Sequence, residues 1–87
     1  MSGSNENTRA IRQILQDHAR LSVHAAELGE NSNLYDAGLT SHASVTLMLA
    51  LEEHFQVEFP ERMLRRNTFA TIAAIRTAVE ELIGADV

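Results

Sequence analysis

Apolar residues recur at helical spacing in three stretches of the chain. The first stretch places four residues at i, i+3, i+4 and i+7: Ile11, Ile14, Leu15 and His18. Polar residues stand between them, so the pattern predicts one apolar stripe on a helix from about Thr8 to about Leu21. Asn7 or Thr8 can cap this helix.

The second helix is predicted from Ser41 to about Phe55, a stretch without Gly or Pro, and either Thr40 or Ser41 can cap it. At about 100° per residue, one broad face includes the large apolar residues expected in the core. Its members are Ala43, Ser44, Leu47, Met48, Leu51, His54 and Phe55. Val45 and Leu49 fall on the other side, on a face that should contact water.

Two further helical segments follow. Residues 60–66 suit one or two short turns, because Pro60 needs no N–H at the first position of a helix. The last helix has one apolar face made of Ile72, Ile75, Val79, Leu82 and Ile83. Thr68 or Thr71 can cap it, and Gly84 can end it.

Residues 22–39 are too many for an ordinary connection between two helices. Four apolar residues can pin this segment over the helices: Leu28, Leu34, Tyr35 and Leu39. Gly38 offers a sharp bend just before the second helix. We therefore predict an all-α fold, a small four-helix bundle with three longer helices, one short third helix and a long ordered loop between helices one and two.

A chain of 87 residues is one small domain at most. We expect a disordered, polar N-terminal segment over residues 1–7, the folded domain over residues 8–84 and a C-terminal tail over residues 85–87. No apolar run approaches the roughly 20 residues of a membrane span, and no leader resembles a signal peptide. We therefore expect a cytoplasmic protein.

Cysteine is absent, which excludes disulfides, Cys-ligated zinc and a thiol nucleophile made by the chain itself. Seven Arg, no Lys and twelve acids give a net charge of −5, which disfavours binding to nucleic acid or an anionic membrane. Residues 21–61 contain no Arg but the acids Glu27, Glu30, Asp36, Glu52, Glu53, Glu58 and Glu61. This middle segment predicts an anionic surface suited to a cationic protein partner.

Val45 and Leu49 share their face of the second helix with four polar residues: Ser41, His42, Glu52 and Glu53. Two exposed aliphatic side chains beside carboxylates suggest a small docking patch with an electrostatic rim. Two simpler readings stay open on these residues alone. A Ser at a helix start is far more often a cap than a modified residue, and residues 22–39 could cover the two aliphatic side chains.

A longer pattern surrounds this helix. It includes Asp36-Ala37-Gly38-Leu39-Thr40-Ser41, the stretch from Val45 to Phe55, Val57-Glu58-Phe59-Pro60 and Thr68-Phe69-Ala70-Thr71-Ile72. From about Leu34 to Ile83 the chain resembles the acyl carrier protein family, the phosphopantetheine-binding carrier proteins.

The resemblance implies a carrier and not an enzyme. It implies that a phosphopantetheinyl transferase attaches 4′-phosphopantetheine from coenzyme A to Ser41, and this cofactor would bring the thiol that the chain lacks. It also implies that Val45, Leu49, Glu52 and Glu53 dock the partner enzymes. Leu39, Thr40 and His42 are expected on the same surface.

Two departures from the usual family pattern bear on which subgroup of carriers the chain resembles. Thr40-Ser41-His42 replaces the usual Asp-Ser-Leu, and the short third helix, usually acidic, carries Arg62, Arg65 and Arg66. The stretch from Gly38 to Val45 is similar to a bacterial subgroup aminoacylated by stand-alone ligases that resemble the core of seryl-tRNA synthetase. This resemblance implies an amino acid activated as its adenylate and transferred to the cofactor thiol.

Alternatives remain at this point. The chain could be an acyl carrier protein of a specialised lipid or polyketide pathway, served by acyl-transferring enzymes, or a helical protein-interaction module without a prosthetic group. The four His residues lack the i, i+4 spacing of a ligand pair, so we expect no metal. A Ser41–His42 hydrolase would lack a pocket and an oxyanion hole. We expect no nucleic-acid partner and a monomer when the protein is free.

Overall fold

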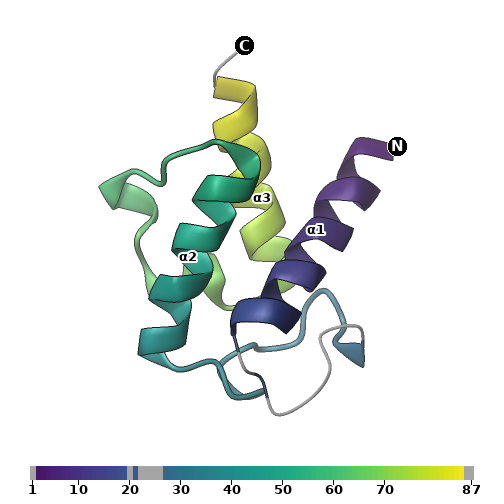
Figure 1. Cartoon of the computed structure of the whole chain (residues 1–87), viewed down its shortest axis with the longest axis vertical. Helices are drawn as coiled ribbons and strands as arrows, with labels where there is room; N and C mark the ends of the chain where they lie inside the picture. The colour runs from purple at the N-terminus through teal and green to yellow at the C-terminus, as the bar shows by residue number, and fades with distance from the viewer. Residues whose placement is uncertain (1, 20, 22–26, 86–87) are drawn as a thin grey trace.

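The computed structural model describes residues 2–19, 21 and 27–85. In this part of the chain all regular structure is helical: α1 (Ser2–His18), α2 (Ser41–Phe55), η2 (Glu61–Met63), η3 (Arg66–Phe69) and α3 (Ile72–Ala85). The three α-helices form a bundle in which α1 packs against both α2 and α3 (Figure 1). The all-α prediction is confirmed, but two separate 3-10 turns stand where one short third helix was expected.

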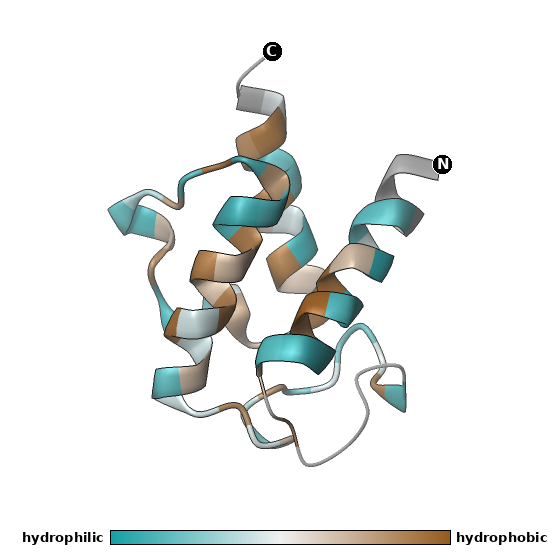
Figure 2. Cartoon of the chain, viewed as in Figure 1, coloured by the Kyte–Doolittle hydropathy of each residue, from teal (hydrophilic) through white to brown (hydrophobic). Residues whose placement is uncertain are grey.

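The core is formed by buried residues of all three α-helices, each of which contains apolar segments (Figure 2). Eight large side chains are almost completely buried: Ile11, Leu15, Leu34, Leu47, Leu51, Ile72, Ile75 and Val79. Each stabilises the fold by roughly 1.5–3 kcal/mol relative to an exposed side chain. The apolar faces predicted for α1, α2 and α3 therefore form the core at these positions.

The predicted limits of α1 are wrong at both ends. The helix includes Ser2 to Asn7, the segment expected to be disordered, and it ends at His18. Near the predicted start, contacts join α1 to α3: the Asn7 amide donates to Glu80 Oε2 at 3.1 Å, and Arg76 Nη1 donates to Thr8 Oγ1 at 3.0 Å. His18 is exposed and does not complete the apolar stripe, whereas Ala19 is buried.

Backbone hydrogen bonds to residues 70 and 73 hold the loop before α2 in place over the range that the structure describes, residues 27–39. The Leu34 N–H donates to the Ala70 carbonyl at 2.7 Å, and the Ala73 N–H donates to the Glu30 carbonyl at 2.9 Å. Leu34 and Leu39 are buried, and Gly38 has a φ of 113°, which favours glycine. The ordered loop was thus predicted correctly over this range, while residues 22–26 lie outside the described residues.

The segment after α2 returns the chain to the core in two turns. Pro60 precedes η2, as its preference for helix starts predicts, and Met63 and Phe69 bury their side chains. Thr71 then caps α3, because its Oγ1 accepts a hydrogen bond from the Ala74 N–H at 3.0 Å. The helix continues through Gly84, the expected end, to Ala85.

Substitution of Leu34 tests how much the buried loop contributes to the fold. Leu34→Ala should lower the free energy of unfolding by about 2–5 kcal/mol, because it leaves a cavity beneath the loop. Chemical denaturation monitored by circular dichroism measures this loss. Leu49→Ala is the matched control: its side chain is 55% exposed, so it should change the stability by no more than about 0.5 kcal/mol. Equal losses in the two variants would contradict the packing described above.

Candidate functional site

Thr40 and Ser41 have different roles at the start of α2. Thr40 has extended backbone angles, and its Oγ1 accepts a hydrogen bond from the Ala43 N–H at 3.0 Å. Its carbonyl accepts the first helical hydrogen bond, from the Ser44 N–H at 2.9 Å. Thr40 is therefore the N-cap residue, and Ser41 is the first residue of the helix.

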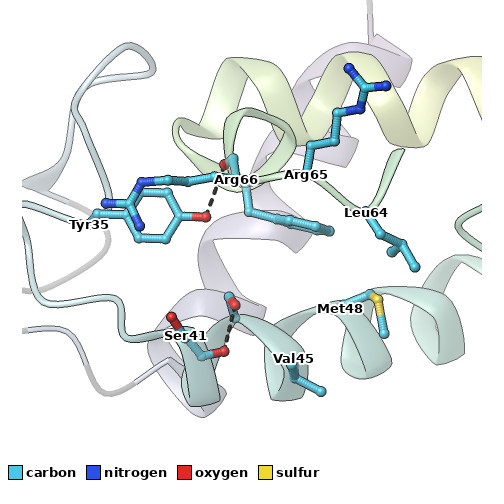
Figure 3. Close-up of a pocket in the computed structure, with 9 residues that line it drawn as sticks. Tyr35, Ser41, Val45, Met48, Leu64, Arg65 and Arg66 are labelled. Atoms are coloured by element: carbon cyan, nitrogen blue, oxygen red, sulfur yellow. Dashed lines mark hydrogen bonds between the residues drawn. The ribbon is translucent and has the colours of Figure 1, made fainter. Parts of the chain in front are cut away.

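The Ser41 hydroxyl is not used by the fold. Ser41 is exposed, and among the described residues none forms a hydrogen bond with its Oγ. The contact drawn at Ser41 in Figure 3 involves its carbonyl, which accepts from the Ser44 hydroxyl at 2.7 Å. No hydrogen bond joins Ser41 to His42 in this part of the structure, so the geometry offers no Ser–His pair.

The other residues predicted for the docking surface divide into exposed and structural positions. Val45 and Leu49 are 54% and 55% exposed, so the described part of the loop does not cover them, and His42 and Glu53 are exposed as well. Leu39 is only 4% exposed, and its predicted place on this surface is wrong because its side chain anchors the loop in the core.

Glu52 also has a structural contact. Its Oε2 accepts a hydrogen bond from the Phe59 N–H at 2.8 Å, which ties α2 to the segment that leads into η2. Phe59 is itself buried and packs against Phe69 with ring centroids 5.5 Å apart. Any variant of Glu52 is therefore expected to disturb packing as well as surface charge.

Ser41 lies on the wall of a cavity of about 350 Å³ between α2 and the η2–η3 segment. The cavity is lined by Tyr35, Ser41, Ser44, Val45, Met48, Leu64, Arg65, Arg66 and Phe69. Sequence analysis did not link Leu64, Arg65 and Arg66 to Ser41, because the contact depends on how the η2–η3 segment folds back beside α2. Leu64, about half exposed, was missed as a surface residue.

Tyr35 and Arg66 form a pair at this cavity. The guanidinium carbon of Arg66 lies 3.7 Å from the centroid of the Tyr35 ring, and the Tyr35 hydroxyl donates to the Arg66 carbonyl at 2.9 Å. Burial raises the pKa of the Tyr35 phenol above its usual value of 10.0, and the charge of Arg66 opposes this rise. Each residue thus restricts the position of the other.

The described residues provide neither a cluster of metal ligands nor a membrane-spanning helix. Over residues 2–19, 21 and 27–85, no group of three His, Asp or Glu side chains lies close enough to hold a metal ion. Within the same ranges no helix has both the length and the apolar character needed to cross a bilayer. The exposed Ser41 hydroxyl beside a cavity is therefore the candidate functional group.

The family described as "Phosphopantetheine attachment site" matches residues 9–79. The chain belongs to this family. It is a carrier protein whose cofactor is 4′-phosphopantetheine, and it holds a group for other enzymes without catalysing the transfer itself. The family predicted from the sequence is confirmed, and the matched range lies within the predicted domain of residues 8–84, whose boundaries remain a prediction.

The carrier protein is similar to several known carriers. It is 42% identical over 73 residues to the aminoacyl carrier protein of Agrobacterium fabrum, which covers 84% of this chain and 88% of that relative. A carrier protein from Agrobacterium tumefaciens, solved with an engineered Bradyrhizobium japonicum glycine:[carrier protein] ligase and ATP, is 41% identical with a TM-score of 0.84, over 86% of this chain and 97% of that one.

A second ligase complex gives a more distant match. The glycylated carrier protein bound to the Bradyrhizobium japonicum glycine:[carrier protein] ligase is 25% identical with a TM-score of 0.72, over 84% of this chain and 97% of that one.

The capping role of Thr40 can be tested by substitution. Thr40→Ala should lower the free energy of unfolding by about 0.5–2 kcal/mol, because the first-turn N–H of Ala43 loses its acceptor. Thr40→Ser keeps a hydroxyl at this position and should retain most of the stability. Thermal and denaturant unfolding of the two variants measure the difference, and a Thr40→Ala protein as stable as the wild type would show that the cap lies elsewhere.

Proposed function

We propose that this chain is an aminoacyl carrier protein that bears 4′-phosphopantetheine on Ser41. The observation that carries the proposal is the exposed Ser41 hydroxyl, left free because Thr40 caps the helix. Ser41 begins a helix that has no acidic residue in its first turn. The positive end of the helix dipole favours a phosphate at this position, so the residues present fit the group.

The chain has no thiol of its own, since it contains no Cys. When bound, the cofactor supplies a thiol on a flexible arm, which can hold the carboxyl group of a cargo molecule as a thioester. Ser41 serves as the anchor of this arm through its Oγ. It needs no neighbouring base, because the transferase that modifies it would supply the catalytic groups.

The proposed cargo is a small amino acid, loaded by an ATP-dependent amino acid:carrier protein ligase. The similarity to an aminoacyl carrier protein and to carriers solved with glycine:[carrier protein] ligases supports this choice. The short stretch Thr40-Ser41-His42, which departs from the usual Asp-Ser-Leu of acyl carriers, supports it from the sequence. A cytoplasmic location and a monomeric state remain predictions.

The proposed docking surface for the ligase is the exposed side of α2. Val45 and Leu49 supply apolar area that is more than half exposed, and Glu53 and His42 supply its polar rim. Thr40, at the helix start, can contribute through its exposed atoms while it caps the helix. A ligase with a cationic rim would be attracted to this surface, because the segment of residues 21–61 contains no Arg.

Mass spectrometry of the intact protein tests the attachment site. After incubation with coenzyme A and a broad-specificity phosphopantetheinyl transferase, the wild type should gain one phosphopantetheine mass, and Ser41→Ala should gain none. Ser44→Ala is the matched control, because it removes a hydroxyl one turn further along α2 and should still be modified. Modification of Ser41→Ala, or a wild type that no transferase modifies, would overturn the proposed site.

The docking surface is tested by the rate of amino acid loading on the modified protein, with glycine, ATP and a glycine:carrier protein ligase. Glu53→Arg should slow loading roughly tenfold, equivalent to about 1.4 kcal/mol, because it reverses an exposed charge beside Leu49. Glu58→Arg makes the same charge change at an exposed position outside α2 and should load at nearly the wild-type rate.

Two results would contradict this part of the proposal. Equal loading rates for Glu53→Arg and the wild type would show that Glu53 takes no part in docking the ligase. A protein that accepts fatty acyl groups from acyl-transferring enzymes but no amino acid from any ligase would favour the alternative, an acyl carrier of a lipid or polyketide pathway.

A further inference from the structure

The cavity beside Ser41 has a cationic end. Figure 3 shows the guanidinium of Arg66 over the Tyr35 ring at the end of the cavity where Ser41 lies, while Leu64 and Met48 lie toward the other end. No acidic residue lines this cavity. In the described structure, the guanidinium of Arg66 therefore has no carboxylate partner within the cavity.

The contact with Tyr35 leaves the hydrogen-bonding edge of Arg66 available. A guanidinium stacked on a ring uses its flat face, whereas its N–H donors point outward in its own plane. The Tyr35 ring holds the guanidinium of Arg66, whose central carbon lies 3.7 Å from the ring centroid. The hydrogen bond from the Tyr35 hydroxyl holds the Arg66 carbonyl. Arg66 is thus a positioned cation whose N–H groups can donate hydrogen bonds to an anionic ligand.

Tyr35 is itself fixed by the loop. Its backbone N–H donates to Asn33 Oδ1 at 2.9 Å, and the neighbouring Leu34 is completely buried. The loop before α2 therefore determines where Arg66 is held.

The two neighbouring Arg residues differ from Arg66. Arg62 forms an ion pair with Glu81 at 3.3 Å, on the side of η2 that faces α3. Arg65 lines the same cavity, but its guanidinium points away from Ser41 in Figure 3. Of these three cations, only Arg66 combines a fixed position with a place at the Ser41 end of the cavity.

We propose that Arg66 binds the phosphodiester that joins the prosthetic arm to Ser41, and so directs the first part of the arm into the cavity between α2 and the η2–η3 segment. The inference rests on the proposed modification of Ser41. A phosphodiester carries one negative charge and oxygen acceptors that suit the planar N–H donors of a guanidinium. The ion pair would hold the arm against its own carrier until a partner enzyme draws it away.

Phosphorus-31 NMR of the modified protein tests the contact directly, without any loading enzyme. The phosphorus resonance of the wild type should differ from that of Arg66→Gln, and added salt should move the wild-type resonance toward that of Arg66→Gln because salt screens the ion pair. Arg65→Gln is the matched control. It removes the same charge from the adjacent residue and should keep the wild-type resonance.

A second measurement uses the wild type alone and does not depend on the folding of any variant. The Nε–Hε signal of Arg66 in a proton–nitrogen NMR spectrum should shift when Ser41 is modified, while the corresponding signal of Arg65 should stay in place. An Arg66 signal that does not move, or a phosphorus resonance affected equally by Arg65→Gln and Arg66→Gln, would overturn the inference.

The mass of each sample separates the two proposals. A wild type that gains no phosphopantetheine mass on Ser41 would overturn the proposed function and this inference with it. A wild type that gains the mass but shows neither NMR change would overturn only the role of Arg66.

Discussion

The hydrogen bond from the Ala43 N–H to the Thr40 hydroxyl decides how this carrier protein uses two adjacent hydroxyl groups. A helix start leaves several N–H groups without partners, and a Ser or Thr at this place commonly satisfies one of them. Thr40 performs this task and Ser41 does not. The Ser41 hydroxyl can therefore be modified without taking a hydrogen bond from the fold.

The residues before Ser41 explain why the hydroxyl lies where it does. Gly38 turns the chain with a positive φ, and Leu39 buries its side chain in the core. Thr40 then caps the helix, and Ser41 follows as its first, exposed residue. Four successive residues thus have four separate physical roles, which together set the position of the Ser41 hydroxyl, the proposed attachment point.

The surface around Ser41 carries both signs of charge. The exposed side of α2 contributes Glu53, whereas Arg65 and Arg66 lie across the cavity, on the η2–η3 segment. The net charge of −5 does not show this division, which arises because three of the seven Arg residues lie in the short segment of residues 62–66. The acidic side suits a cationic partner surface, and the basic side suits the phosphate of the proposed arm.

Much of the fold could be predicted from helical spacing and capping residues. The bounds of α2 follow from its capping residue and from the absence of Gly and Pro. The core positions Leu47 and Leu51 and the exposure of Val45 and Leu49 follow from one helical wheel. The attachment of α1 to α3 could not be predicted this way, because the hydrogen bond between Asn7 and Glu80 joins residues far apart in the chain.

The site was predictable only in part. Its serine stands in a recognisable pattern at a helix start, but spacing alone could not decide between Thr40 and Ser41 as the cap. The pairing of Tyr35 with Arg66 and the burial of Leu39 depend on how the loop and the η2–η3 segment fold against α2. Tertiary contacts of this kind leave no local periodic signal.

The stability of Ser41→Ala tests the central claim most directly. If the Ser41 hydroxyl takes no part in the fold, this unmodified variant should keep the free energy of unfolding of the unmodified wild type to within about 0.5 kcal/mol. Denaturant unfolding of the two proteins under the same conditions measures the difference. A loss of about 1 kcal/mol or more, as expected for removal of a helix cap, would show that Ser41 helps to cap α2 and would contradict the account.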